Sequence, residues 1–187
     1  LKKHNIDYKI EYFGKKPKEV REYFNVLDDL HLNAFGADEF ALSKSFFDKP
    51  STKKMARETC RKHLNTVMRK WGAKTGNRLY TCFKEDKTII GDGRYNKNWL
   101  PFNCRATNDF RSVENVAYMV NVFLPPILKR AAYEKETEFS DDVHSLGEML
   151  QFLYRGCIRE DKKMNIYIPS SRMRNLLFRW LDGEFTE

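Results

Sequence analysis

The stretch MNIYIPSSRMRNLLFRWLDG, residues 164–183, decides the fold. Residues 164–168 form a short apolar run typical of a buried strand, and Pro169 ends that run. The serines that follow are suited to cap a helix, and Gly183 is suited to end it. The apolar side chains of this predicted helix fall on one face: Met173, Leu176, Leu177 and Trp180. A buried strand followed at once by an amphipathic helix is typical of α/β proteins.

The residues upstream continue this alternation of strands and helices. We expect short strands at RLYTCF (78–83), KTIIG (87–91) and NWLPFNC (98–104), with glycines and Asn96 in the turns between them. The apolar run 112–136 predicts a long helix that Pro125 and Pro126 kink or split. Another helix is expected over 141–159. This order predicts an α/β domain with a central, largely parallel sheet flanked by helices.

The first third of the chain predicts a mainly helical elaboration of the same domain. Residues 6–13, IDYKIEYF, alternate apolar and polar side chains as a strand does, and a helix is expected from Pro17. Its apolar positions are Val20, Phe24, Leu27 and Leu30. We therefore expect one domain, with residues 1–76 as its N-terminal part and 77–187 as its core.

A long basic helix is predicted from Ser51 or Thr52 to the glycine at position 72. One stripe of this helix is suited to the core: Met55, Thr59, Cys60, Leu64, Val67, Met68 and Trp71. The rest of its surface carries cations: Lys53, Lys54, Arg57, Arg61, Lys62, Arg69 and Lys70. These cations form either a solvated face or a surface that follows phosphates. On the second interpretation Lys54, Arg57 and Arg61 would bind nucleic acid.

The composition favours a folded domain with a polyanionic partner. The chain has 187 residues, 41% of them hydrophobic, which is enough for a sizeable core. It contains 34 Lys and Arg against 26 Asp and Glu, a formal net charge of +8. Basic proteins attract phosphates and release counterions on binding, so DNA or RNA is the expected partner.

The remaining composition predicts a cytoplasmic protein without a metal site. Cys60, Cys82, Cys104 and Cys157 are far apart, with no C-x-x-C pair, so reduced and mostly buried thiols are expected. No apolar run approaches the roughly 18 residues of a membrane helix. The first ten residues, LKKHNIDYKI, are too charged for a signal peptide, and no membrane partner is expected.

The stretch LQFLYRGCIR, residues 150–159, carries candidate catalytic residues. At about 100° per residue, Gln151, Arg155 and Arg159 fall in a row on the helix face opposite the core stripe. Either this is an ordinary polar face, or two guanidiniums reach a polyphosphate across a cleft. Arginine suits the second role because its planar fork stays charged and binds phosphate oxygens at two points.

Two further groups of polar residues follow predicted strands. Arg105, Thr107 and Asn108 come just after the strand expected at 98–104, and Lys84 follows the strand expected at 78–83. The carboxyl ends of strands face the ligand crevice in open α/β sheets, so these four are candidate nucleic-acid contacts. The alternatives are a capped loop for the first three and a surface lysine for Lys84.

Several of these segments resemble superfamily 2 helicases. QFLYRGCIR (151–159) resembles their motif VI, usually Q-x-x-G-R-x-x-R, and NCRATN (103–108) resembles the motif V region. YTCFK (80–84), NCRATN and LGEMLQF (146–152) occur in the order found in the C-terminal part of DEAD/DEAH-type helicase proteins of phages and mobile elements. The resemblance covers roughly residues 77–182. It departs from the family pattern at Tyr154, which stands in place of glycine, and at Arg159, which comes one residue late.

The resemblance implies the second RecA-like lobe of a helicase or ATPase. Arg155 would be the arginine finger, Gln151 would position nucleotide or water, and Arg159 would be a second candidate. Loop residues 105–108 would couple nucleic-acid contact to the cleft between lobes. ATP and Mg²⁺ would be held by an N-terminal RecA-like lobe of the same polypeptide, and this chain alone would bind neither.

The chain itself lacks the sequence signals of an ATP site. The segment WGAKTGNR (71–78) has the wrong glycine spacing for a phosphate-binding loop. Asp141 and Asp142 stand at a predicted helix start, where they would act as caps, not as Mg²⁺ ligands. Two other functions stay open: a stand-alone basic α/β nucleic-acid-binding module that uses helix 52–71, and a protein-interaction domain with an incidental positive surface.

Overall fold

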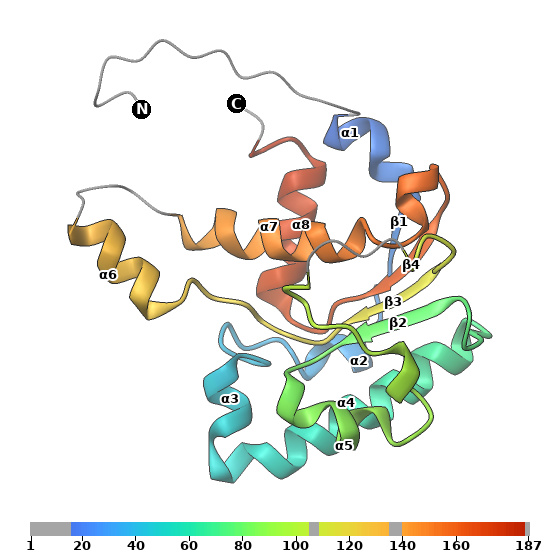
Figure 1. Ribbon diagram of the computed structural model, residues 1–187, viewed down its shortest axis with the longest axis horizontal. Coiled ribbons are helices and arrows are strands. Elements are labelled where there is room, and N and C mark those ends of the chain that lie inside the picture. The colour runs from blue at the N-terminus through green and yellow to red at the C-terminus, as the bar shows by residue number, and fades with distance from the viewer. Residues whose placement is uncertain (1–15, 105–108, 135–139, 186–187) are drawn as a thin grey trace.

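A parallel four-stranded sheet runs through the centre of the computed structural model, which describes residues 16–104, 109–134 and 140–185 (Figure 1). The strands are β1 (Phe24–Val26), β2 (Arg78–Thr81), β3 (Asn115–Tyr118) and β4 (Met164–Tyr167). Their order is β1-β4-β3-β2, and all three pairings are parallel. The last strand of the chain therefore lies between the first and the third. The predicted α/β fold with a parallel sheet is confirmed.

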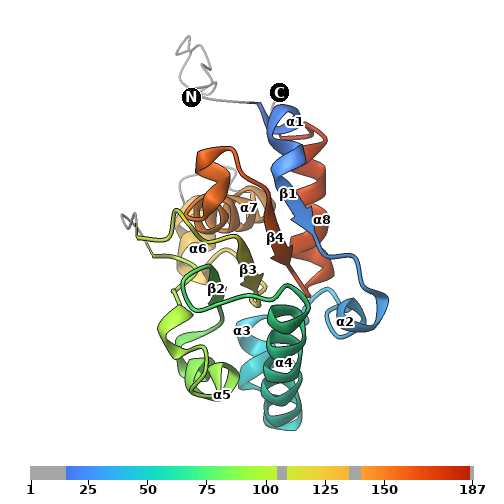
Figure 2. The same ribbon diagram turned by 90° about the vertical axis from the view of Figure 1, so that its right-hand side faces the viewer.

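Helices cover both faces of this sheet (Figure 2). One face is covered by α1 (Pro17–Val20), α7 (Asp141–Leu153) and α8 (Ser171–Leu181). The opposite face is covered by α3 (Lys44–Asp48), α4 (Pro50–Lys70) and α5 (Lys87–Gly91). The helices on both faces make the three-layer arrangement that parallel sheets require, because such strands are apolar on both sides.

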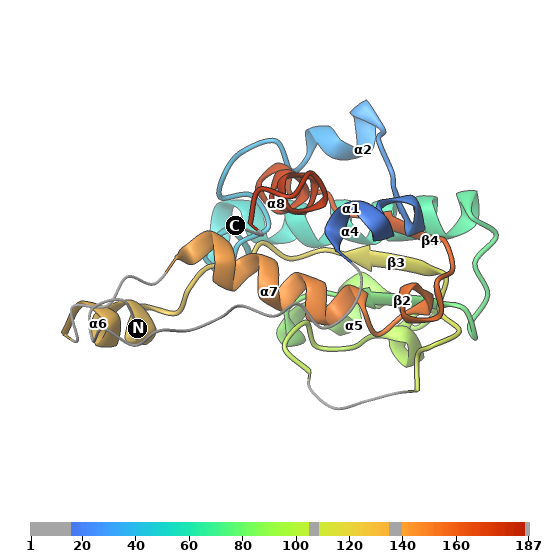
Figure 3. The same ribbon diagram turned by 90° about the horizontal axis from the view of Figure 1, so that it is seen from above.

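The other elements lie at the edges. Helix α2 (Leu30–Ala34) follows β1, and α6 (Pro126–Glu134) projects beyond the sheet (Figure 3). Short 3₁₀ turns complete the fold: η2 (Arg21–Tyr23), η3 (Lys84–Asp86), η4 (Asn96–Asn98) and η5 (Cys157–Glu160). The strand predicted at residues 6–13 lies outside the described residues.

Successive residues of β2, β3 and β4 pack in the hydrophobic cores on opposite faces of the sheet. Leu79 of β2 and Val116 of β3 face α7 and α8, whereas Tyr80 and Ala117 face α4. In β4, Ile166 likewise faces α7 and α8, and the tyrosine that follows it faces α4. Because side chains alternate along a strand, a short parallel strand can serve both cores at once.

An asparagine ladder crosses the amino ends of three strands. Asn25 donates to the Oδ1 of Asn165 at 2.7 Å, and Asn165 donates to the Oδ1 of Asn115 at 2.9 Å. Asn115 in turn donates to the carbonyl of Asn77 at 3.1 Å. The three strand asparagines are partners in the sheet register, so the ladder favours this register over a slipped one.

Five sequence predictions are confirmed by the structure. The strand at 78–83 is β2, the strand at 164–168 is β4, and the helix at 170–183 is α8, with Ser170 as its N-cap. The basic helix is α4, and Gly72 follows it with a φ of 59°. The buried thiols include Cys60, Cys82 and Cys157.

Other predicted elements are wrong. KTIIG (87–91) is the helix α5, and 98–104 contributes only an isolated bridge from Trp99 to Tyr80. The helix expected from Pro17 ends at Val20, and its continuation forms η2 and β1 because pairing with β4 overrides the helical pattern.

The long helix expected at 112–136 is the strand β3 followed by an extended segment and α6. All four residues of β3 are buried. A strand buried on both faces has no alternation in its sequence and is easily mistaken for a buried helix.

Helix α4 is tied to the sheet through the half-buried His63. His63 Nδ1 lies 2.8 Å from the hydroxyl of Tyr167, which donates to the carbonyl of Leu32 at 2.9 Å. Burial lowers the pKa of His63 below its usual 6.5, and Asp29 only partly opposes this shift. Burial also raises the pKa of Tyr167, so both side chains stay neutral near pH 7.

The stability of the protein should therefore rise with pH in the mildly acidic range. Below pH 6.5 the unfolded chain protonates at His63 before the folded chain does, so this stability is lost as the pH falls through the lowered pKa. His63→Gln cannot titrate and should flatten the dependence between about pH 5 and 7, as measured by urea unfolding. The exposed His31→Gln is the control, and an unchanged slope in His63→Gln would contradict the assignment.

Candidate nucleotide and nucleic-acid sites

The polar row predicted on helix 141–159 does not exist, because α7 ends at Leu153. The amide of Tyr154 caps the helix by donating to the carbonyls of Leu150 and Phe152. Gly156 then packs so closely that a Cβ there would lie 2.6 Å from Met164 Sδ and 3.0 Å from the carbonyl of Val113. A side chain at this position would have to displace Met164 or the Val113 carbonyl, so glycine allows the chain to turn inward after α7 without such a shift.

The three candidate catalytic residues therefore have different environments. Gln151 is exposed on the last turn of α7, and Arg159 is exposed on η5. Arg155 is buried, with only 8% of its surface exposed, and its Nη2 donates to the carbonyl of Cys104. The expectation of an arginine on the open helix face is thus wrong.

This contact brings two distant segments together. Arg155 and Cys104 are 51 residues apart in the sequence, yet their hydrogen bond brings the segments 103–104 and 151–155 together. Cys104 immediately precedes residues 105–108. Arg105, Thr107 and Asn108 lie outside the described residues. The amide of Cys157 donates to the carbonyl of Val113, just before β3, which places this region near the amino end of the sheet.

Lys84 lies at the opposite end of the sheet. It follows the carboxyl end of β2, in η3, and it is exposed. Because all four strands are parallel, their carboxyl ends share one edge. The structure therefore separates Lys84 from Arg155.

Carboxylates neutralise several cations of α4. Arg57 forms an ion pair with the buried Asp86, with a hydrogen bond of 2.6 Å from its Nε. Arg61 lies 3.5 Å from a carboxylate oxygen of Asp92. Lys54 is exposed on the same helix. Arg57 thus joins α4 to the segment that begins α5.

Arg57→Ala should lower the free energy of unfolding by about 3 kcal/mol, because it leaves the Asp86 carboxylate buried without a counter-charge. Arg57→Ala combined with Asp86→Asn should recover part of that loss. Lys54→Ala is the control and should change stability by less than about 0.5 kcal/mol. Urea unfolding measures all three, and a stable Arg57→Ala variant would exclude this anchoring role.

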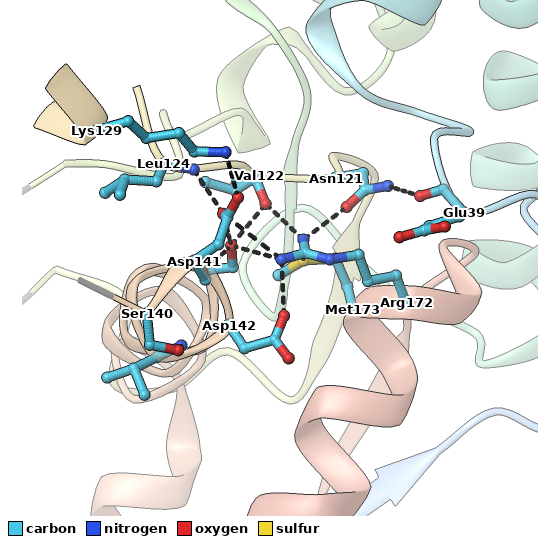
Figure 4. Close-up of polar contacts among 12 residues, drawn as sticks. Glu39, Asn121, Val122, Leu124, Lys129, Ser140, Asp141, Asp142, Arg172 and Met173 are labelled. Atoms are coloured by element: carbon cyan, nitrogen blue, oxygen red, sulfur yellow. Dashed lines mark hydrogen bonds and ion pairs between the residues drawn. The ribbon is translucent and has the colours of Figure 1, made fainter. Parts of the chain in front are cut away.

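A polar cluster that no sequence pattern predicts surrounds Arg172 at the carboxyl edge of the sheet (Figure 4). Nη1 of Arg172 donates to the Oδ1 of Asn121 at 3.2 Å and to the carbonyl of Val122 at 2.7 Å. Nη2 donates to Asp142 at 3.0 Å and to Ser145 at 3.2 Å. One guanidinium on α8 therefore holds both the segment that follows β3 and the start of α7.

Asp141 extends this cluster toward α6. Its Oδ1 accepts from the amide of Leu124 at 2.7 Å, and its Oδ2 accepts from Lys129 at 2.7 Å. Burial raises the pKa of Asp141, but the bonds from Lys129 and Leu124 outweigh burial and lower the pKa below 3.8. Ser140 caps α7 by accepting from the amide of Val143 at 3.3 Å, so the cap expected from Asp141 and Asp142 is Ser140 instead.

Arg172→Ala should cost about 3 kcal/mol of unfolding free energy, because it leaves carboxylates and a carbonyl partly buried without a donor. Arg172→Lys keeps the charge but loses the planar fork, and should lie between the wild type and alanine. Arg179→Ala is the control, because its side chain is 43% exposed and it also contacts Asp142. Equal urea midpoints for the alanine variants at 172 and 179 would contradict this prediction.

The described residues show no group of three or more His, Cys, Asp or Glu side chains arranged to hold a metal ion. No helix among them is both long and apolar enough to cross a membrane.

A parallel sheet covered on both faces defines this chain as a Rossmann-like α/β domain. The chain belongs to the family of YonV C-terminal Rossmann-like domains, whose family model matches residues 18–181. It is 32% identical over 187 residues to the SPbeta prophage-derived protein YonV of Bacillus subtilis (strain 168). The match covers 97% of this chain but 45% of YonV, so the chain spans less than half of that relative. No solved structure matches the chain.

Proposed function

We propose that this domain is the second lobe of a nucleic-acid-dependent ATPase. ATP and Mg²⁺ would be held by a RecA-like lobe of the same polypeptide. The contact between Arg155 and the carbonyl of Cys104 supports this proposal most directly. It joins the segment that resembles motif VI to the segment that resembles motif V. A motor needs such a junction, because nucleic-acid contact must change the nucleotide site.

Arg155 would act as an arginine finger that binds a backbone carbonyl until the two lobes close around ATP. Its guanidinium is buried against a neutral carbonyl, and a phosphate oxygen offers a stronger, charge-assisted hydrogen bond. When two lobes close around ATP, the guanidinium would exchange the carbonyl for the γ-phosphate and stabilise the charge that develops there. The exposed Gln151 would position nucleotide or water, and Arg159 is the second cation within this segment.

Nucleic acid would act on the same junction from the other side. Arg105, Thr107 and Asn108 directly follow Cys104 in the chain. A strand bound by these residues would displace the backbone next to the Cys104 carbonyl, and thereby release Arg155. Nucleic-acid binding and ATP turnover would then be coupled through the contact between Arg155 and the Cys104 carbonyl.

The alternative, a stand-alone basic module that binds nucleic acid through α4, finds less support. That function depends on uncompensated charge along the helix. Asp86 and Asp92 pair with Arg57 and Arg61, and Asp29 lies 3.5 Å from Lys70. These pairs reduce the field that α4 presents to a phosphate backbone.

In the complete polypeptide, Arg155→Ala should lower nucleic-acid-stimulated ATP turnover by about 10³-fold, because one charge that stabilises the transition state is lost. The Kd for single-stranded DNA should not rise, because the contact with Cys104 that DNA binding would break is already absent in this variant. Steady-state kinetics and fluorescence anisotropy measure the two effects.

Lys162→Ala, an exposed neighbour, is the control and should change neither quantity. Thermal unfolding of Arg155→Ala verifies that the variant is folded at the assay temperature. Equal losses of ATP turnover and DNA binding in a folded Arg155→Ala variant would refute the finger role.

A further inference from the structure

A cavity of about 460 Å³ lies at the carboxyl ends of β2 and β3, and Arg155 is not among its lining residues. Its volume falls within the range of about 300–1,000 Å³ that is typical of small-ligand pockets. Its lining comes from the segments before α3 and after β2 and β3, and from α6. The lining residues that matter below are Phe40, Phe83, Phe102, Phe123, Lys44 and Lys129.

The cavity lies where neighbouring strands send the chain to opposite faces. The chain leaving β2 enters α5, on the same face as α4. The chain leaving β3 passes through α6 to α7, on the opposite face. Open α/β sheets bind ligands in the crevice outside such a divergence of strands.

Aromatic rings line this cavity. Phe40 stacks on Phe123 with ring centroids 5.8 Å apart and planes 22° apart. Phe83 meets Phe102 edge to face at 6.0 Å. Phe40 is 58% exposed, so a large apolar ring remains in water beside the cavity. Flat aromatic surfaces of this kind stack well on nucleobases.

Two ammonium groups join these rings. Lys44 lies 5.6 Å from the centroid of Phe83, and Lys129 comes from α6. Lys44 pairs with Asp48 at 3.0 Å and with Glu85 at 3.6 Å, and Lys129 pairs with Asp141 at 2.7 Å; both lysines are about half exposed. Exposed ion pairs contribute little stability, so a phosphate can compete for these cations.

The polar groups of the lining are already engaged. The amide of Asn121 donates to the carbonyls of Glu39 and Ala41, and its Oδ1 accepts from Arg172. Ser43 accepts from the amide of Phe46. These side chains therefore have little capacity to read the hydrogen-bonding edge of a base, and a ligand would be held by stacking and charge.

We infer that this cavity binds one base of a single-stranded nucleic acid, with the adjacent phosphates on Lys44 and Lys129. The inference rests on the proposed nucleic-acid dependence and deepens it, because it places a strand contact at the carboxyl edge. Binding here is tolerant of base identity.

The test compares an oligothymidylate about 12 nucleotides long with an abasic strand of equal length, by fluorescence anisotropy. The wild-type chain should prefer the strand with bases by about tenfold, which stacking alone can supply. Phe40→Ala should abolish that preference. Leu30→Ala, which removes another exposed apolar side chain on α2, is the control and should keep it. A preference that survives Phe40→Ala overturns the inference.

The phosphate contacts have a separate readout. The double variant Lys44→Gln, Lys129→Gln should bind both oligonucleotides more weakly. Because two cations are lost, the slope of log affinity against log salt concentration should fall in magnitude by about 1.4. Lys53→Gln with Lys62→Gln on α4 is the matched control and should leave the slope unchanged. An unchanged slope in the Lys44 and Lys129 variant overturns the phosphate assignment.

A third arm separates a strand from a free nucleotide. Thymidine monophosphate that binds as tightly as the strand, and loses affinity in Phe40→Ala, would show a nucleotide site instead and overturn the strand assignment. If the wild-type protein binds neither oligonucleotide, both this inference and the proposed function are refuted. Wild-type protein that prefers bases while Phe40→Ala behaves identically would sink the cavity assignment alone.

Discussion

The guanidinium of Arg172 holds the carboxyl edge of the sheet together. It donates to Asn121 and Val122 in the segment after β3, reaches Asp142 and Ser145 on α7, and lies 4.3 Å from the ring centroid of Phe123. Parallel strands leave their last carbonyls facing one edge, and loops there need partners. A planar cation with five donors can satisfy several of them at once. The walls of the carboxyl-edge cavity are therefore fixed by a side chain that does not line it.

The sequence predicts the elements that carry local signals. Strand β4 and helix α8 have an apolar run, a stopping proline and a capping serine, and they appear as expected. Strand β3 has no such signal, because burial on both faces removes alternation. The end of α7 was missed for a related reason: apolar spacing continues to Cys157, whereas the turn depends on the close approach of Gly156 to Met164.

The candidate sites were likewise predictable only where a local sequence pattern marks them. Arginines at 155 and 159 can be selected from residue type and spacing, but the contact of Arg155 with Cys104 is a tertiary event that no local pattern encodes. Arg172 occupies an ordinary polar position of an amphipathic helix, so the sequence does not indicate that it bonds to several separate segments. Arg57 likewise reads as one cation among several until Asp86 is placed beside it.

The central position of β4 governs when this protein can fold. Asn25 of β1 pairs with Asn165, which is 140 residues further along the chain. Such distant contacts are formed late, since a long loop must close before they contribute. During synthesis β3 can pair with β2, but β1 has no neighbour and one edge of β3 is unpaired until β4 emerges. Any chain that stops before β4 would expose two unpaired strand edges, and aggregation is the expected fate of such a product.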